Sequence, residues 1–274
     1  MFERILENVS KKTPLVHLIT NYVTVNDCAN IILACGGSPI MADDINEVEE
    51  ITSICSSLVI NIGTLNEKTI GSMIKAGKKA NDLGHPVILD PVGAGASRLR
   101  TETVFALLKE IRFSVIRGNI SEIKTVYKGS GTTKGVDADV KDVVNDNNLD
   151  EVVSFAKTLS KKTGAVIAIT GAIDIVADSE KAYIIRNGHP IMSKITGAGC
   201  MLTAVIGSFC GANYDDILDS TAAAICAMGL CGELAVDRMK AIDGGTSSFK
   251  TFLIDYMSKM NSEVLNGGIK IEGK

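Results

Sequence analysis

A glycine-rich segment at residues 197–200 has the composition of an anion-binding turn. Gly197, Ala198, Gly199 and Cys200 precede the apolar run MLTAVIGSF. Glycines let backbone N–H groups approach a ligand closely, and a helix that follows directs its positive end at an anion. The segment therefore suits a phosphate or a developing negative charge, although short glycine runs often only turn the chain. It lacks the third glycine of a dinucleotide fingerprint and the Gly-Lys-Ser/Thr of a Walker A loop.

Cys200 falls in the first turn of the helix that this segment predicts. A thiol in that position can act as a base or as an anionic contact, because the helix amides favour negative charge. The alternative is a small buried packing residue, which is the reading that we favour for the other six cysteines.

A carboxylate, Asp90, ends the apolar run VIL and precedes Pro91. Ligands of open α/β sheets bind outside the carboxyl ends of the strands. A lone carboxylate there suits a contact to Mg²⁺ through water, because this cation keeps several waters and takes phosphate oxygens as ligands. A turn-forming Asp before a proline is the alternative.

Two further predicted strands also lead into polar or glycine residues. One ends in Arg117, whose planar fork of donors could reach a phosphate. Asn119 and Glu122 follow it with the spacing of a helix capping box, which would explain both without a ligand. The other ends at Thr170 and Gly171, where a plain strand-ending turn is the alternative.

The segments HLITNYV and SPIM offer a surface of another kind. Asn21 and Met41 supply one polar and one soft apolar contact, as a small heteroaromatic ligand requires. A capping Asn and a core Met are the alternatives for this pair. His17 lies within an apolar run, so we expect a hydrogen-bonded core residue rather than a base. The three histidines are far apart and lack the spacing of metal ligands.

A buried sheet must position these residues. Strands are predicted at residues 15–19, 39–41, 57–62, 86–90, 114–117, 165–170, 173–177 and 182–186, several of them with the unbroken apolar core of a strand covered on both faces. Helical patterns cover the segment from a capping Asn66 to Gly84 and residues 150–162, 199–210, 214–240 and 247–259. The alternation predicts one three-layer α/β/α domain over residues 1–274, with a mostly parallel central sheet. Residues 128–148 are polar, and we expect a surface segment there with a short helix at 140–144.

Composition argues against several function classes. The chain has 274 residues, a net charge of -4, 4% aromatic residues and no Trp, and its lysine pairs are scattered. Nucleic-acid binding is therefore not expected. Seven cysteines without a CxxC pair indicate a reducing cytoplasm. The charged N-terminus lacks an apolar signal core, and the glycines that open the low-charge stretch at 195–214 suit a loop feeding a buried helix, so no membrane partner is expected.

Six segments, taken in order, resemble the hydroxyethylthiazole kinases. They are LVHLITNYVTVNDCANIILACGGSPIMA, NIGTL, VILDPVGAGAS, IRGNISEI, AITG and ITGAGCMLTAVIGSF, spread from about residue 15 to 210. The first is particular to that family, whereas DPVGAG and GAGC are shared more loosely across the ribokinase-like superfamily. The resemblance implies a ribokinase-like fold and ATP- and Mg²⁺-dependent phosphorylation of the hydroxyl of 4-methyl-5-(2-hydroxyethyl)thiazole, in thiamine (vitamin B1) salvage. It also implies a cytoplasmic homotrimer with sites at subunit interfaces.

The resemblance assigns roles residue by residue. The thiazole pocket would be lined by Asn21, Val23, Met41, Gly63 and Gly197. Mg²⁺ would be held through water by Asp90 and Glu122, and ATP would be contacted by Arg117, Asn119, Thr170 and Gly171. The anion hole at the transfer point, and with it the catalytic set, would be Gly197, Ala198, Gly199 and Cys200. The wider superfamily usually has an Asp base at the position of Cys200. A cysteine there is familiar in the hydroxyethylthiazole kinases and so supports that narrower family, but it leaves the strength of the base open.

Three rival functions stay open at this point. The first is an ATP-dependent dehydratase that repairs hydrated nicotinamide cofactors, which also uses a glycine-rich anion hole. The second is a non-catalytic sensor of thiazole or nucleotide, and the third is an α/β protein that binds some other nucleotide. The segment from residue 15 to 41 argues against the dehydratase, and the combination of Asp90, Glu122 and the glycines argues against a sensor.

Overall fold

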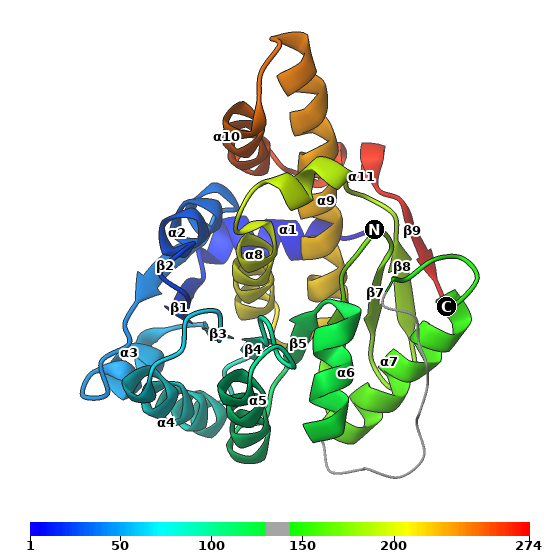
Figure 1. Ribbon diagram of the computed structural model, residues 1–274. Helices are drawn as coiled ribbons and strands as arrows, with labels where there is room; N and C mark the ends of the chain where they lie inside the picture. Colours follow the sequence, from blue (N-terminus) through cyan, green and yellow to red (C-terminus); the bar gives the residue numbers. More distant parts are fainter. Residues whose placement is uncertain (130–142) are drawn as a thin grey trace.

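One sheet runs through the centre of the molecule. The computed structural model describes residues 1–129 and 143–274. In this part of the chain the strands form one nine-stranded sheet in the order β2-β1-β3-β4-β5-β6-β7-β8-β9, with helices on both faces (Figure 1). The predicted α/β/α architecture is therefore confirmed.

The strands are short, and those from β2 to β6 in the sheet run parallel. The pairs β6–β7, β7–β8 and β8–β9 are antiparallel. All eight predicted strands are present, each within one residue of its expected ends. The bounds are β1 (Leu15–Ile19), β2 (Ser38–Met41), β3 (Ser57–Asn61), β4 (Val87–Asp90), β5 (Val115–Gly118), β6 (Val166–Ile169), β7 (Asp174–Ala177), β8 (Ala182–Ile185) and β9 (Ile271–Gly273), the last of which the sequence did not predict.

Two helix layers cover the sheet. On one face α3, α4, α6 and α7 pack against the strands, and α5 lies between α4 and α6. On the other face α8 covers β1, β3 and β4, while α9 covers β6, β7 and β8. The bounds are α1 (Glu3–Lys12), α2 (Val25–Ala34), α3 (Val48–Ile54), α4 (Glu67–Leu83), α5 (Arg98–Glu110), α6 (Ile120–Gly129), α7 (Leu149–Thr163), the 3-10 helix η1 (Pro190–Lys194), α8 (Ala198–Ala212), α9 (Ile217–Ala241), α10 (Thr246–Met257) and α11 (Ser262–Gly268).

Alternating side chains explain the unbroken apolar strands. In β3, Val59 belongs to the core beneath α8, whereas Leu58 and Ile60 belong to the core beneath α4. All three are at most 1% exposed. Because helices cover both faces, neither side of the strand needs polar residues.

The caps of α4 confirm the local prediction. The side chain of Asn66 accepts from the backbone N–H of Thr69, which in turn completes a capping box, and Gly84 ends the helix in the left-handed conformation. Capping groups of this kind satisfy backbone groups that the helix itself leaves unpaired.

Helix α8 passes close to the sheet and is almost wholly buried. A Cβ on Gly207 would lie 2.5 Å from Cγ2 of Val59, so only a glycine permits this approach. Residues 201–212 are all buried, as expected for a buried helix that follows the glycine loop. Among the described helices, α9 alone is long and apolar enough to cross a membrane, but 72% of its apolar window is buried inside the protein.

The expected surface segment is described only at its ends. Helix α6 runs to Gly129, so Lys128 is helical, and residues 143–148 precede α7 without forming a helix. The short helix expected at residues 140–144 falls mostly outside the described residues.

Candidate active site

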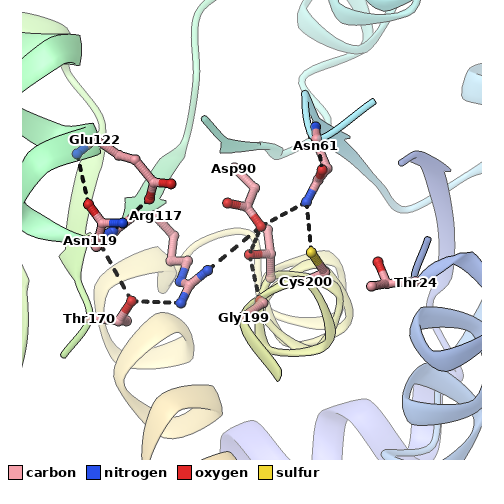
Figure 2. A network of polar contacts seen from close by, with 12 residues as sticks. Thr24, Asn61, Asp90, Arg117, Asn119, Glu122, Thr170, Gly199 and Cys200 are labelled. Atoms are coloured by element: carbon pink, nitrogen blue, oxygen red, sulfur yellow. Dashed lines mark hydrogen bonds and ion pairs between the residues drawn. The ribbon is translucent and has the colours of Figure 1, made fainter. Parts of the chain in front are cut away.

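Most of the predicted site residues meet at the carboxyl edge of the parallel strands. Figure 2 shows polar side chains from several strand ends facing the first turn of α8. A cavity of about 610 Å³ lies there. Its lining includes Asp90, Arg117, Asn119, Glu122, Thr170, Gly171 and the whole of 197–200. Segments that are distant in sequence therefore form one cleft.

Asp90 ends β4 and is fully buried. Its Oδ2 accepts hydrogen bonds from Asn61 Nδ2 and Thr203 Oγ1, both at 2.9 Å, and lies 3.7 Å from Nη1 of Arg117. Burial raises the pKa of Asp90 to about 6, although the Arg117 guanidinium opposes the shift. Among the described residues, Oδ1 has no hydrogen-bond partner. A buried carboxylate oxygen without a protein partner is available to accept from water or a ligand or to face a cation.

Arg117 lies beside Asp90 on the neighbouring strand. Its Nη2 donates to Thr170 Oγ1 at 2.6 Å, while its buried Nε has no partner among the described residues. A Cβ on Gly199 would lie 2.7 Å from Nη1 of Arg117, so the first turn of α8 packs directly against the guanidinium. Both cationic and backbone donors therefore face one region, as binding of a phosphoryl group requires.

Glu122 and Asn119 form the expected capping box at the start of α6. Asn119 N donates to Glu122 Oε2 at 2.8 Å, and Glu122 N donates to Asn119 Oδ1 at 2.9 Å. Glu122 Oε1 also accepts from the backbone N–H of Gly93 at 2.8 Å, so the same carboxylate holds the turn after β4. The capping explanation is correct for both residues. Glu122 can still accept further hydrogen bonds, because a carboxylate has about four lone-pair positions.

Cys200 is half-buried and accepts two amide hydrogen bonds. Asn21 Nδ2 lies 3.2 Å from its sulfur and Asn61 Nδ2 lies 3.3 Å away. Cys200 is therefore held in a polar network on one side and borders the cavity on the other.

Gly197 adopts a left-handed backbone with φ +86° immediately before α8. This conformation favours glycine, because a side chain there would be strained. The turn leaves the first backbone N–H groups of α8 without partners inside the helix, in the position where an anion can bind them.

Four of the five predicted thiazole residues end or follow β1, β2 and β3, on the opposite side of β4 from Arg117 of β5, whereas the fifth, Gly197, lines the cavity. Asn21 is buried, and a Cβ on Gly63 would lie 3.0 Å from the Cβ of Asn21, so these two are neighbours. Met41 ends β2 beside Leu18 of β1. Val23 is 58% exposed. These four are not among the described residues that line the cavity.

Several residues of the site were not predicted. Asn61 and Thr203 both bind Asp90, and Asp174 lines the cavity near Arg117 and accepts from the backbone N–H of Gly171 at 2.8 Å. Asn61 could have been found, since it is a polar residue at the end of an apolar strand. Thr203 carries no comparable signal, because it sits within the buried run of α8.

His17 proves to be a core residue, as predicted. Its Nδ1 lies 2.9 Å from Thr52 Oγ1 and its Nε2 lies 2.8 Å from the carbonyl oxygen of Ala42. Burial lowers the pKa of His17. Within the described part of the chain, no three His, Cys, Asp or Glu side chains gather as metal ligands. A cation here would have to take ligands from water and from a bound phosphate.

Comparison with known proteins decides the family. A model of the hydroxyethylthiazole kinase family matches residues 6–263. The chain is 62% identical over 272 residues to a hydroxyethylthiazole kinase of Clostridium acetobutylicum, covering 99% of each chain. It is 53% identical over 261 residues to the hydroxyethylthiazole kinase of Clostridium tetani, covering 95% of this chain and 93% of that one. The chain belongs to the hydroxyethylthiazole kinase family.

Membership in the hydroxyethylthiazole kinase family confirms the enzyme class predicted from the sequence, a kinase acting on the thiazole alcohol of thiamine salvage. A solved hydroxyethylthiazole kinase from Pyrococcus horikoshii superposes with a TM-score of 0.89 at 32% identity, covering 100% of this chain and 98% of that one. A ribokinase-like superfamily protein of Enterococcus faecalis superposes with a TM-score of 0.62 at 12% identity, covering 93% of this chain and 88% of that one, which supports the fold alone.

Proposed function

We propose that residues 1–274 form one kinase domain that transfers the γ-phosphoryl group of ATP, with Mg²⁺, to the hydroxyl of 4-methyl-5-(2-hydroxyethyl)thiazole. The observation that carries the proposal is a pair of buried, unpartnered groups in the described chain, Asp90 Oδ1 and Arg117 Nε, beside the first turn of α8. One is an acceptor suited to a hydrated cation and the other a donor suited to a phosphate oxygen.

The chain's own groups would act mainly by position and charge. Phosphoryl transfer has a loose transition state whose charge is spread over the equatorial oxygens, so fixed donors contribute most. The backbone N–H groups at 197–200 and the guanidinium of Arg117 supply such donors to the same cavity. The substrate oxygen bonds to phosphorus as the bond to the ADP oxygen breaks. The sulfur of Cys200 would orient the alcohol and, as a thiolate, accept the hydroxyl proton.

The carboxylates fit a water-mediated magnesium site. Oδ1 of Asp90 has no partner in the described part of the chain, and Glu122 keeps lone pairs after its backbone contacts. When bound, Mg²⁺ would supply positive charge that partly neutralises the ATP phosphates. Asn119, Thr170 and Gly171 would border the nucleotide, because they line the same cavity.

The thiazole would bind among Asn21, Val23, Met41, Gly63 and Gly197, close to Cys200. Val23 and its neighbour Tyr22 are 58% and 78% exposed, so the outer wall of that pocket is open to solvent in one chain. Closing the pocket needs another surface. A homotrimer with the site at each interface, working in the cytoplasm, would supply it.

One assay separates this function from its rivals. We expect ADP to form only when the thiazole alcohol is added with ATP and Mg²⁺, together with a product heavier by one phosphoryl group. Turnover of hydrated NADH without the alcohol would identify the dehydratase instead. Binding of the alcohol and ATP with no ADP formation would identify a sensor, and both results would reject the proposal.

A further inference from the structure

The side-chain amide of Asn61 uses all four of its hydrogen-bonding positions. Its Nδ2 donates to Asp90 Oδ2 at 2.9 Å and to Cys200 Sγ at 3.3 Å. Its Oδ1 accepts from Asn21 Nδ2 at 3.0 Å and from the backbone N–H of Gly63 at 2.9 Å. Asn61 is 2% exposed, and Figure 2 shows its amide nitrogen joined by dashed lines to both Asp90 and Cys200.

These partners fix the orientation of the amide. Rotating it by half a turn would set its oxygen against the carboxylate of Asp90 and its NH₂ group against the N–H of Gly63. Both contacts would then be repulsive, since acceptor would meet acceptor and donor would meet donor. Asn61 is therefore held in one orientation by groups from two sides of the site.

Asn21 is fixed in the same way. Its Oδ1 accepts from Thr24 N at 3.1 Å and from Thr24 Oγ1 at 3.0 Å, which leaves Nδ2 to donate to Asn61 Oδ1 and to Cys200 Sγ. The sulfur thus receives one hydrogen from each asparagine. A half-buried side chain with two fixed donors on one flank has little freedom to leave the cavity edge.

We propose that Asn61 is a positioning residue that, with Asn21, clamps the sulfur of Cys200 and ties it to Asp90. One amide nitrogen bonds both the sulfur and the carboxylate, so it sets the distance between the group that faces the alcohol and the group that faces the cation. It also occupies Oδ2 of Asp90 and leaves Oδ1 for that cation. This role rests on the proposed function, which supplies the alcohol and the nucleotide.

The test replaces a donor by an acceptor of the same shape. Asn61→Asp removes the N–H that is donated to Cys200 and places a second carboxyl group beside Asp90, where the pair holds one proton because two carboxylates this close do not both ionise. We expect kcat to fall about 10²-fold, as misplacement of reacting groups does, with KM for the alcohol changed less than about threefold. Asn213→Asp is the matched control, because Asn213 is also buried and hydrogen-bonded through Nδ2 to the carbonyl oxygens of Phe209 and Ile5. It should lower the melting temperature and leave kcat within about twofold.

A second measurement needs no turnover. Iodoacetamide alkylation of Cys200 is followed by peptide mass mapping without any ligand. The thiolate is the reactive form and the N–H of Asn61 favours it, so loss of that donor in Asn61→Asp should slow alkylation at least about fivefold, whereas Asn213→Asp should leave the rate unchanged. Unaltered alkylation and kcat in Asn61→Asp, or an equal loss of kcat in Asn213→Asp, would overturn the clamp. A wild-type protein without alcohol-dependent ADP formation would instead reject the proposed function, and alkylation would still decide the clamp.

Discussion

Thr24 packs directly against Gly197, since a Cβ added at position 197 would come within 2.8 Å of Cγ2 of Thr24. Thr24 lies just before α2 and Gly197 just before α8, and both are next to the proposed transfer point. Position 197 therefore requires glycine for two reasons: its backbone is left-handed, and a side chain there would collide with Thr24.

Gly197→Ala is expected to lower kcat about 10²-fold, because the displaced turn takes backbone donors away from the developing charge. Steady-state kinetics with the thiazole alcohol and ATP measure the effect. Gly84→Ala is the control, since Gly84 also has a positive φ, of +71°, but a Cβ there would meet nothing within 4 Å. That variant should cost about 1–2 kcal/mol of stability and leave kcat unchanged. Equal kinetics in the two variants would remove Gly197 from the mechanism.

Substitutions of Cys200 should separate its hydrogen bonding from its packing. Cys200→Asp is expected to keep kcat within about tenfold, since a carboxylate also accepts from the two asparagine amides and from the alcohol. Cys200→Leu should lose about 10²–10³-fold, because it accepts nothing and leaves two buried N–H groups unpaired. A serine hydroxyl accepts hydrogen bonds more weakly than a carboxylate, so kcat of Cys200→Ser should lie between those of the other two variants. Normal turnover by Cys200→Leu would show that the assigned role is wrong.

The sequence predicted most of the sheet because its strands lie between two helix layers and so read as short apolar runs. Strand β9 was missed, since Ile271–Gly273 is a short edge strand with one apolar residue and no periodic signal. In the described part of the chain β9 pairs with β8, which lies many residues earlier, so no local sequence pattern reveals the pairing.

The site was predictable as far as strand ends could be recognised. Asp90 and Arg117 stood out because each ends an apolar strand, and the parallel register then brings them together. The contact of Asn61 with Cys200 depends on how α8 crosses the sheet, which is set by packing at Gly207. Sequence spacing carries no information about that crossing.

We expect the exposed apolar side chain of Val23, in the proposed thiazole pocket, to lie at the interface between subunits. Val23→Lys is expected to shift the mass in analytical ultracentrifugation from a trimer toward a monomer, because burying a charge at an interface is unfavourable. If the site is shared between subunits, KM for the alcohol should rise at least about tenfold at the same time. Leu83→Lys is the control, as Leu83 is 42% exposed at the end of α4 that lies away from the site. A monomeric wild-type protein with full activity would contradict the proposed assembly.

The carboxyl group of Asp174 should make stability depend on pH. Burial raises the pKa of Asp174 to about 7 from 3.8, although the Gly171 N–H and Arg117 oppose the shift. A folded-state pKa above the unfolded value means that the folded protein binds this proton more tightly, so its contribution to stability is lost as pH rises from about 4 to about 7. Asp174→Asn cannot ionise and keeps an acceptor for Gly171. Between pH 5 and pH 7 its free energy of unfolding should gain about 2–3 kcal/mol relative to wild type, measured by urea denaturation. The exposed Asp255→Asn should follow the wild-type profile, and parallel curves for Asp174→Asn and wild type would show that burial does not hold this proton.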